Sequence, residues 1–583
     1  MTITRSAVAV VVLTAAIAAG LYVSKRRAQP AGVPATGTPS ATLVRGGELV
    51  ASYRTEPASY NRYVDNTAAG ELVSLLTYAP LVHIDRVTDT LEPWLAESWT
   101  QSADGKAYTL KLRQGVTFSD GVPFTSADVV FSFTALYDPR VNAVFAADTF
   151  VNGTPLKVEA PDASTVVFHL PAAFAPGLRL IDGIPILPRH KLQAALDAGT
   201  FGRAWSAATP PAEIAGLGPF VLAEHVSGQR LVFVRNPRYW RKDAAGTQLP
   251  YLDKLTVLVV PDQNTEALRM QAGEIDLMGS GEIRPEDYAA FRRIAEQGRL
   301  KLIDAGVGLD PNLLWFNLSP AGASNPRSAW FRQKAFRQAI SCAADRQGIV
   351  NTVHLGAAVP IYGPITPANR LWYSEPTSKC DRDPARARTL LASAGLTDRN
   401  GDGMLEDASG TPVRFSILTH RGHTIRERTV AVLQEQLRQV GLAIDVVALD
   451  PPALAQRWSR GDYDTIYFAV QASGTDPGLN PQLWLSSGNY HFWNPEQRAP
   501  ATEWERRIDD LFRQQEAELR FPERQRLMTE AVRILEDELP VIYFVAPKVT
   551  LSVSSRVVNP KPAPQIPQLL WSAESLVMAG PGH

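Results

Sequence analysis

Cysteine is scarce in this sequence of 583 residues. Only Cys342 and Cys380 occur. Neither lies near the N-terminus, which excludes a lipid anchor attached to an N-terminal cysteine. The two thiols fit either one disulfide in an oxidising compartment or two separate buried thiols, because the sequence does not set the distance between their Cα atoms.

An excess of charge of either sign is also missing. The chain carries 58 Lys and Arg against 59 Asp and Glu, a net charge of -1. Nucleic-acid binders concentrate basic residues, so that class of protein is excluded. Hydrophobic residues at 45%, charged residues at 20% and 12 Trp are typical of a soluble globular protein, and the length predicts two to four folded units.

A single apolar run, from Ala7 to Val23, follows Arg5. As a helix it spans about 26 Å, slightly less than the roughly 30 Å of a bilayer core. A cleaved signal peptide and a short anchor both fit, and the basic residues 25–27 would favour a cytoplasmic location for that end. We predict export by residues 1–27, followed by a Pro/Gly/Ala-rich linker over 28–45.

Alternating strands and helices predict a mixed α/β fold. Residues 97–101 and 107–112 flank the Asp104-Gly105 turn of a hairpin. A strand over 414–419, a helix over 427–440 and a strand over 443–449 predict a βαβ crossover.

Several helix boundaries carry capping signals. Thr424 and Glu427 have the spacing of a capping box. Asp383 and Pro384 predict a helix start, and Gly395 predicts its end. Two further helices are expected over 503–518 and 522–538.

Seven local strings occur in a fixed order along the chain: GGELVASYRTEPASYN, LEPWLAESWTQSADGKAYTLKLRQGVTFSDGVPFTSADVVFSF, GLGPFVL, RNPRYW, LLWFNL, FRQAISCAADRQGIV and GLAIDVVAL. In this order they resemble the bacterial extracellular solute-binding protein family 5, whose members bind oligopeptides, dipeptides, nickel complexes and some sugars or opines. The resemblance runs from about Arg45 to the C-terminal region.

The resemblance implies an α/β, two-lobed periplasmic-binding-protein-like fold of the large type II class, with an extra subdomain on the first lobe. Transferred by the matching strings, lobe one comprises residues 46–75, 215–308 and 537–583. The extra subdomain comprises 76–214, and lobe two 309–536.

The resemblance also implies a function. We expect the substrate-binding component of an ABC importer, which captures a peptide or peptide-like solute in a cleft between the lobes by domain closure. Its partners would be the permease and its ATPase subunits, at the periplasmic or extracytoplasmic face of the inner membrane. We expect a monomer with no cofactor, whose only own membrane segment is the N-terminal one.

Catalysis is not expected, since the sequence contains no GxxxxGK[ST], HExxH, GxSxG or CxxC motif. Two alternatives stay open. One is a hydrolase with paired carboxylates in the same cleft. The other is a membrane-tethered sensor or chaperone.

Asp476 in the late string FAVQASGTDPGLNPQLW matches the Asp that peptide-binding members place against the peptide's α-ammonium group. An ammonium that loses its hydration in a cleft needs a carboxylate partner. Turn formation by Asp-Pro-Gly explains the same residues. Ala469, Val470 and Ala472 stand where dipeptide binders often have an aromatic and a further acidic residue, which argues against free dipeptides.

An aromatic cluster follows in the string LWLSSGNYHFWNP. Trp484, Tyr490 and Trp493 are candidates to form the wall of a ligand pocket, because aromatic faces bury a large area at little entropic cost. Packing in a hydrophobic core is the competing explanation.

No metal site is expected, with one weak candidate. The loop DRNGDGMLED resembles the first half of a calcium loop, with Asp398, Asn400 and Asp402 as ligands. Its twelfth position is Ser409 instead of Glu, so Glu406 or Asp407 would have to substitute. An ordinary polar turn is the alternative.

Overall fold

The computed structural model describes residues 45–279, 281–469, 475–495 and 497–579. The predicted export segment, residues 1–27, and the linker up to residue 44 lie outside these ranges. Within them, no helix combines the length and the apolar character needed to cross a bilayer.

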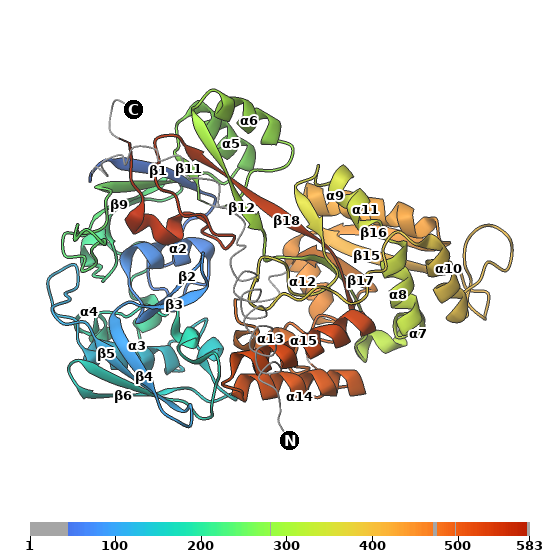
Figure 1. Ribbon diagram of the computed structural model, residues 1–583, viewed down its shortest axis with the longest axis horizontal. Helices are drawn as coiled ribbons and strands as arrows, with labels where there is room; N and C mark the ends of the chain where they lie inside the picture. The colour runs from blue at the N-terminus through green and yellow to red at the C-terminus, as the bar shows by residue number, and fades with distance from the viewer. Residues whose placement is uncertain (1–44, 280, 470–474, 496, 580–583) are drawn as a thin grey trace, which may run out of the picture. The chain divides into compact units, whose positions relative to one another are not determined.

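The part of the molecule built from both ends of the chain contains a mixed sheet in the order β18-β11-β1-β10-β9-β8, with β12 added on β18 (Figure 1). Its strands are β1 (Glu48–Tyr53), β8 (Phe220–Val226), β9 (Arg230–Arg235), β10 (Lys254–Val259), β11 (Leu277–Met278), β12 (Leu300–Val307) and β18 (Val541–Ser554). Strand β1 pairs in parallel with β10 and β11. Helices α5 (Gln263–Ala272) and α6 (Tyr288–Glu296) contribute Met270 and Phe291 to a core shared with Leu300.

The extra subdomain has an antiparallel sheet of its own, in the order β4-β5-β7-β6. Helix α2 (Ala68–Thr77) leads into it from lobe one. Its further elements are β2 (Val82–Asp85), β3 (Thr90–Pro93), β4 (Ala96–Gln101), β5 (Ala107–Leu112), α3 (Ser126–Tyr137), β6 (Lys157–Asp162), β7 (Thr165–His169) and α4 (Arg189–Asp197). The predicted hairpin is confirmed, because β4 and β5 pair across a turn in which Gly105 has a φ of 69°. Tyr108, Leu110 and Leu112 are buried, as alternation on one sheet face predicts.

Lobe two contains the strand order β16-β15-β17-β13-β18, with β14 also pairing with β18. Its strands are β13 (Asn312–Phe316), β14 (Ala358–Pro360), β15 (Arg414–His420), β16 (Ala443–Leu449) and β17 (Thr465–Ala469). Its helices are α7 (Ser328–Phe331), α8 (Lys334–Ala343), α9 (Arg346–Thr352), α10 (Pro384–Ser393), α11 (Thr424–Arg438), α12 (Pro451–Ser459), α13 (Pro481–Trp484), α14 (Glu503–Ala517) and α15 (Phe521–Glu538). The predicted βαβ crossover is confirmed, because α11 connects the parallel strands β15 and β16.

The capping predictions have different outcomes. Asp383 accepts a hydrogen bond from the N–H of Arg386 at 2.9 Å, and α10 begins at Pro384 as expected. The capping box at Thr424 is wrong. The N-cap of α11 is His423, and the carboxylate of Glu427 accepts from the N–H of Gly422 at 2.9 Å.

Strand β18 belongs to both sheets. Its residues 541–545 pair with β13, and its residues 550–554 pair with β12 (Figure 1). The strand changes partners near Pro547, whose carbonyl accepts from the N–H of Gly308. We predicted that the chain returns to lobe one at residue 537. The strand still pairs with β13 of lobe two at Val545, so it changes partners about ten residues later than predicted. The remaining domain boundaries stay predictions.

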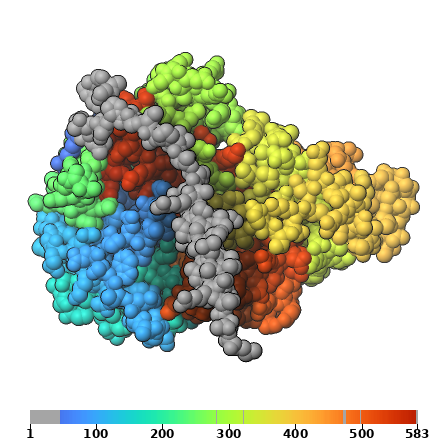
Figure 2. Space-filling view, in the orientation of Figure 1, coloured from blue at the N-terminus to red at the C-terminus, as the bar shows by residue number. Residues whose placement is uncertain are grey.

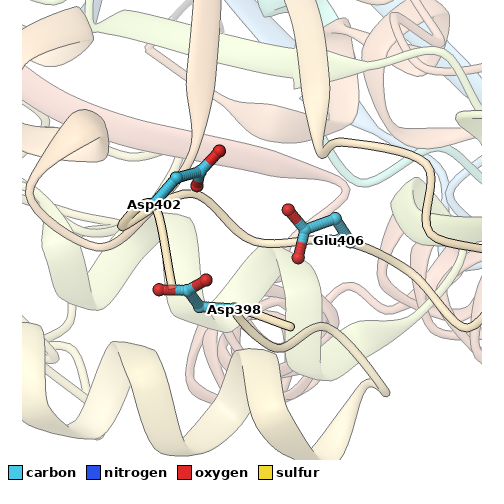
Figure 3. A group of neighbouring side chains, drawn as sticks. All are labelled: Asp398, Asp402 and Glu406. Carbon is cyan, nitrogen blue, oxygen red and sulfur yellow. The ribbon is translucent and has the colours of Figure 1, made fainter. Parts of the chain in front are cut away.

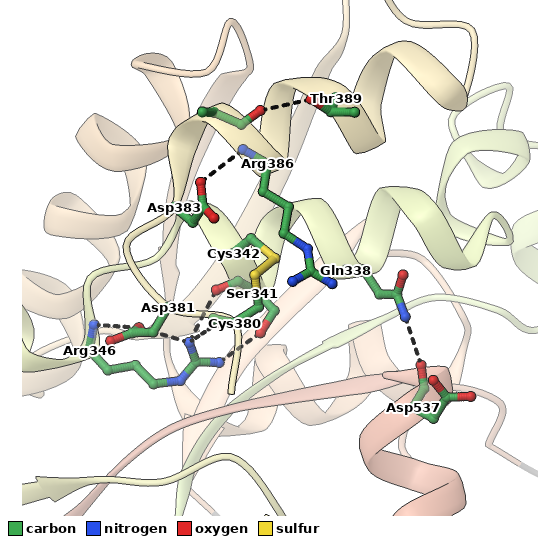
Figure 4. Close-up of a disulfide and its surroundings, with 11 residues drawn as sticks. Gln338, Ser341, Cys342, Arg346, Cys380, Asp381, Asp383, Arg386, Thr389 and Asp537 are labelled. Atoms are coloured by element: carbon green, nitrogen blue, oxygen red, sulfur yellow. Dashed lines mark hydrogen bonds and ion pairs between the residues drawn. A yellow bond between two sulfur atoms is a disulfide. The ribbon is translucent and has the colours of Figure 1, made fainter. Parts of the chain in front are cut away.

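Cys342 and Cys380 form a disulfide with Cα atoms 4.6 Å apart (Figure 4). It links the end of α8 to the segment before α10. Beside it lies Arg346, which is almost fully buried and pairs with Asp381 at 3.0 Å. The open question about the two thiols is thereby answered in favour of the disulfide.

Candidate functional site

A cavity of about 340 Å³ lies where lobe one meets the extra subdomain. Its wall combines rings with charged groups, which is the composition expected of a site for a polar organic ligand. The lining residues come from residues 62–94, 145–149, 180–185, 219–239 and 570–574. A second hollow of about 530 Å³ beside α3 contains only the paired Asp138 and Arg140 as charged groups.

Helix α2 forms one wall of the cavity. The lining residues of this segment follow each other at helical spacing and therefore share one face; they are Glu71, Ser74, Leu75 and Tyr78. The helix start is held by Asp65, which accepts from the N–H groups of Ala58, Ser59 and Thr67 at 2.8 to 3.1 Å. Gly70 is required there, because a Cβ atom would lie 2.5 Å from the carboxyl carbon of Asp65.

The C-terminal segment η7 (Leu570–Ser575) returns to this wall and supplies Trp571 and Glu574. Figure 2 shows residues near the C-terminus, in dark red, at the surface beside the blue and green first half of the chain. The ring of His83 lies 4.5 Å from that of Trp94 and 6.0 Å from that of Trp571, measured between centroids. Residues that are almost 500 positions apart thus form one aromatic surface.

Most charged groups of the wall are already paired. Arg86 forms an ion pair with Glu71 at 3.1 Å, and His83 lies 3.6 Å from Asp182. Glu574 accepts hydrogen bonds from the hydroxyl of Tyr239 and the guanidinium group of Arg241. That guanidinium group lies 3.7 Å from the ring centroid of Trp94, in cation–π contact.

Arg62 and Asp148 are the exceptions. Within the described residues, Arg62 forms no ion pair, although it donates to the main-chain oxygen of Asp65 and lies 5.5 Å from the ring centroid of Phe145. Burial lowers its pKa. Asp148 is exposed, yet the surrounding protein excludes enough water to raise its pKa.

Asp476 does not line this cavity. It lies between lobe two and the extra subdomain and is only 4% exposed. Arg524 donates to both of its carboxylate oxygens, at 2.7 and 2.9 Å, and the N–H of Gly478 donates at 2.9 Å. Its predicted contact with a ligand ammonium stays a prediction, and the ligand would have to compete with Arg524.

The aromatic cluster of lobe two also lies apart from the cavity. Trp484 and Trp493 are 2% and 4% exposed and belong to a hydrophobic core, whereas Tyr490 is 49% exposed. Trp493 donates its indole N–H to Glu505 at 2.9 Å, and His491 contacts the same carboxylate at 3.1 Å. Core packing accounts for both tryptophans, and a ligand contact by any of the three stays a prediction.

The loop proposed for calcium brings three carboxylates together. One oxygen each of Asp398, Asp402 and Glu406 lies within 4.8 Å of the others (Figure 3). The amide group of Asn400 donates to Glu406 at 3.0 Å, and the oxygen of that amide accepts from the N–H of Asp402 at 2.8 Å. These bonds suit an ordinary polar turn equally well, so calcium binding stays a prediction.

The cavity residues were missed by sequence reasoning. Four of them lie within 25 positions of each other: Arg62, Glu71, His83 and Arg86. Such a density of ionisable residues beside Trp94 could have indicated a binding site. Nothing in the sequence linked them to Trp571, because that contact depends on the return of the C-terminal segment.

Comparison with known proteins identifies relatives along most of the chain. The model of bacterial extracellular solute-binding proteins, family 5, matches residues 90–492. A probable ABC transporter-binding protein of Deinococcus radiodurans is 26% identical over 519 residues, 85% of this chain and 86% of that protein. The oligopeptide-binding protein AppA of Bacillus subtilis is 28% identical over 466 residues, 76% of this chain and 79% of that protein.

Solved structures show the same fold. The structure of AppA from Bacillus subtilis in complex with a nonapeptide superposes with a TM-score of 0.71 at 24% identity, covering 92% of this chain and 100% of that chain. The predicted two-lobed α/β architecture is confirmed by this likeness.

Proposed function

This chain belongs to the bacterial extracellular solute-binding proteins, family 5, and on that basis we propose that it captures a peptide or peptide-like solute and presents it to the permease of an ABC importer. AppA, with which it shares 28% identity, is named for oligopeptide binding. Its sequence relatives are thus binding proteins.

The family match over residues 90–492 carries this proposal, and the candidate pocket among the described residues is the cavity behind α2. Its volume of about 340 Å³ falls within the range of about 300–1,000 Å³ that is usual for small-molecule sites. Aromatic rings offer apolar contact, and the ion pairs beside them fix polar groups in place before a ligand arrives.

Contacts between the two halves of the molecule support capture by closure. Arg179 of the extra subdomain donates to the hydroxyl of Thr475 in lobe two at 3.1 Å, and the N–H of Ala175 donates to the carbonyl of Glu516 at 2.6 Å. The halves thus meet beside the cavity-forming subdomain. Capture by closure requires a ligand that contacts both lobes, because only contacts made in the closed form can favour it.

Family 5 proteins act outside the cytoplasm. We place this chain at the outer face of the inner membrane, exported by its N-terminal segment and bound as a monomer to a permease with ATPase subunits. The protein supplies affinity, whereas ATP hydrolysis belongs to the partner chains, so we assign no catalytic residue.

Mass spectrometry of residues 45–583 under native conditions tests the proposal. We expect one intact peptide bound per chain after incubation with a mixture of synthetic peptides of known sequence. Recovery of cleaved peptide would support a hydrolase instead, and absence of any bound peptide would remove the proposal.

Matched variants localise the binding. Ser74→Phe places a ring in the cavity from α2 and should abolish peptide retention. Ser393→Phe makes the same change at an exposed position of α10 and should leave it unchanged. Equal retention in both variants would exclude this cavity as the site.

A further inference from the structure

We propose that the contact between Glu516 of lobe two and residues 172–176 of the extra subdomain is a proton-sensitive latch. The latch holds the two halves of the molecule together when the Glu516 carboxyl group is protonated, and it releases them when that group is charged. The inference rests on the closure step of the proposed function. It goes beyond that function because it names a control on closure that lies in the protein itself and not in the ligand.

The two halves are connected by strands at one edge and touch through noncovalent contacts at another. At the first edge the chain crosses between the halves near Gly308 and again near Pro547, where the N–H of Gly308 donates to the carbonyl of Pro547 at 2.7 Å. At the second edge α14 meets the extra subdomain, at the bottom of Figure 1, whereas β18 crosses higher in the picture. Rotation about the two crossings would therefore separate the contacts at α14.

The contact at α14 is close and, on the side of the extra subdomain, apolar. The N–H of Ala175 donates to the carbonyl of Glu516 at 2.6 Å. A Cβ atom on Gly478 would lie only 2.8 Å from the Cγ of Pro176, so the two main chains approach closely there. Residues 172–176 read AAFAP and contain no ionisable side chain. This segment therefore excludes water from Glu516 without offering its carboxylate a cation.

The carboxylate of Glu516 has no hydrogen-bond or ion-pair partner in the part of the chain that the structure describes. The charged groups that act on it are Arg513 on α14, Arg524 on α15 and Asp476, which caps the turn η6 (Pro477–Leu479). Both guanidinium groups serve other carboxylates. Arg513 lies 3.5 Å from Asp509, and Arg524 donates to both oxygens of Asp476. Protonation therefore neutralises Glu516 at no cost to its neighbours.

The extra subdomain adds one further ion pair to this contact. Arg179 binds the carboxylate of Asp89 and donates to the hydroxyl of Thr475 in lobe two at 3.1 Å. Asp89 and Asp476 thus each have a guanidinium partner, which leaves Glu516 as the carboxylate of the contact without one among the described residues. A charged Glu516 would give the closed contact a surplus of negative charge, and like charges repel at this range.

The direction of the pH effect follows from the titration of Glu516. Burial raises its pKa from 4.5 to about 8. Separation of the halves returns the carboxyl group to water, where it titrates near 4.5. Closure therefore takes up a proton between these two values: the latch is strongest below about pH 4.5 and weakens as the pH rises toward 8. A protein that acts outside the cytoplasm would thus close more readily in acidic surroundings.

Pulsed electron paramagnetic resonance of a spin-label pair measures the separation of the halves. The sequence contains only Cys342 and Cys380, which are bonded to each other, so introduced cysteines are labelled selectively. Ala194→Cys on α4 and Ala455→Cys on α12 place one label on each half at exposed positions. Distances are recorded at about pH 5.5 and about pH 8.5, without peptide and with the mixture of synthetic peptides.

The ratio of closed to open molecules should fall by roughly 10- to 100-fold between the two pH values, because each unit of pKa difference corresponds to about tenfold. Glu516→Gln keeps the shape of the neutral carboxyl group and should stay as closed at the higher pH as wild type is at the lower. Glu516→Ala should lose the pH dependence as well, and an unchanged thermal midpoint shows that each variant is folded.

Glu503→Gln is the matched control, at an exposed position of the same helix. Hydrogen bonds from Arg506 lower the pKa of Glu503, so this group stays charged throughout the pH range of the experiment. The control should open with rising pH as wild type does.

Equal distances in wild type at both pH values would overturn the latch, and so would a Glu516→Gln variant that opens with pH as wild type does. Neither result affects the proposed function, which retention of an intact peptide at about pH 5.5 tests separately. If no peptide is retained while the halves of wild type still respond to pH through Glu516, the proposed ligand fails and the latch stands.

Discussion

The cavity behind α2 and the aromatic cluster of lobe two contain the same kinds of side chains and differ in what these side chains contact. Both combine tryptophan, histidine and carboxylates. In lobe two, Glu505 accepts from His491 and Trp493, and the rings beside them fill a core. In the cavity, Arg62 and Asp148 have no ionic partner among the described residues, and space remains beside them.

This difference shows what distinguishes a binding surface from a core of similar composition. A core satisfies its polar groups internally, because an unpaired buried group costs about 1–3 kcal/mol. A binding surface leaves groups unpaired where a ligand can pair them. The same substitution should therefore affect mainly stability in one region and mainly ligand binding in the other.

The largest effect is expected for Arg524→Met in lobe two. The change leaves the carboxylate of Asp476 buried without its partner and should lower the free energy of unfolding by about 3–5 kcal/mol. Urea unfolding followed by tryptophan fluorescence measures it. The double variant with Asp476→Asn should recover part of the loss, and a single variant as stable as wild type would contradict the argument.

A smaller effect, dependent on pH, is expected at Glu505. Burial alone would raise the pKa of this carboxyl, but hydrogen bonds from His491, Trp493 and Thr502 hold it at about 2. In the unfolded chain the group titrates near 4.5. Its contribution to the free energy of unfolding is therefore present above about pH 4.5 and is lost as the pH falls toward 2, by about 3 kcal/mol in total.

Thermal unfolding between pH 6 and pH 2.5 checks this contribution. Glu505→Gln should be less stable than wild type near neutral pH, and the gap should narrow in acid. Glu97→Gln, at an exposed position of β4 without an ion pair among the described residues, is the control that should not show this narrowing. A constant gap for Glu505→Gln would mean that the carboxylate charge is not involved.

The smallest stability effect is expected for Arg86→Met at the cavity wall. Its ion pair with Glu71 is partly exposed, so the free energy of unfolding should change by less than about 1 kcal/mol. The same replacement of Arg by Met is thus compared in both regions, again by urea unfolding. A loss as large as that of Arg524→Met would erase the contrast between the two regions.

Local patterns predicted the elements of this fold well. The β4–β5 hairpin, the crossover through α11 and the start of α10 depend on neighbours in sequence, such as Asp383 and Pro384. The error at Thr424 is instructive. Glu427 bonds the N–H of Gly422 in the loop before the helix, an alternative that the spacing of residue types does not distinguish from a capping box.

The candidate site was less predictable. Asp476 matched a ligand-binding residue by its motif, but its partner Arg524 is 48 positions away, and only the folded chain shows that the two are paired. Conversely, Asp148 lies in an unremarkable stretch of sequence. Its carboxylate has no ionic partner among the described residues, and only the three-dimensional structure shows this.

The position of β18 in the chain has a consequence for the order of folding. This strand lies between β13 and β11, at the point where the two sheets join, yet it occupies residues 541–554 of 583. A growing chain that ends before residue 541 leaves unpaired strand edges on both sides of the missing strand, and such edges promote aggregation. Synthesis of nearly the whole polypeptide must therefore precede completion of either lobe.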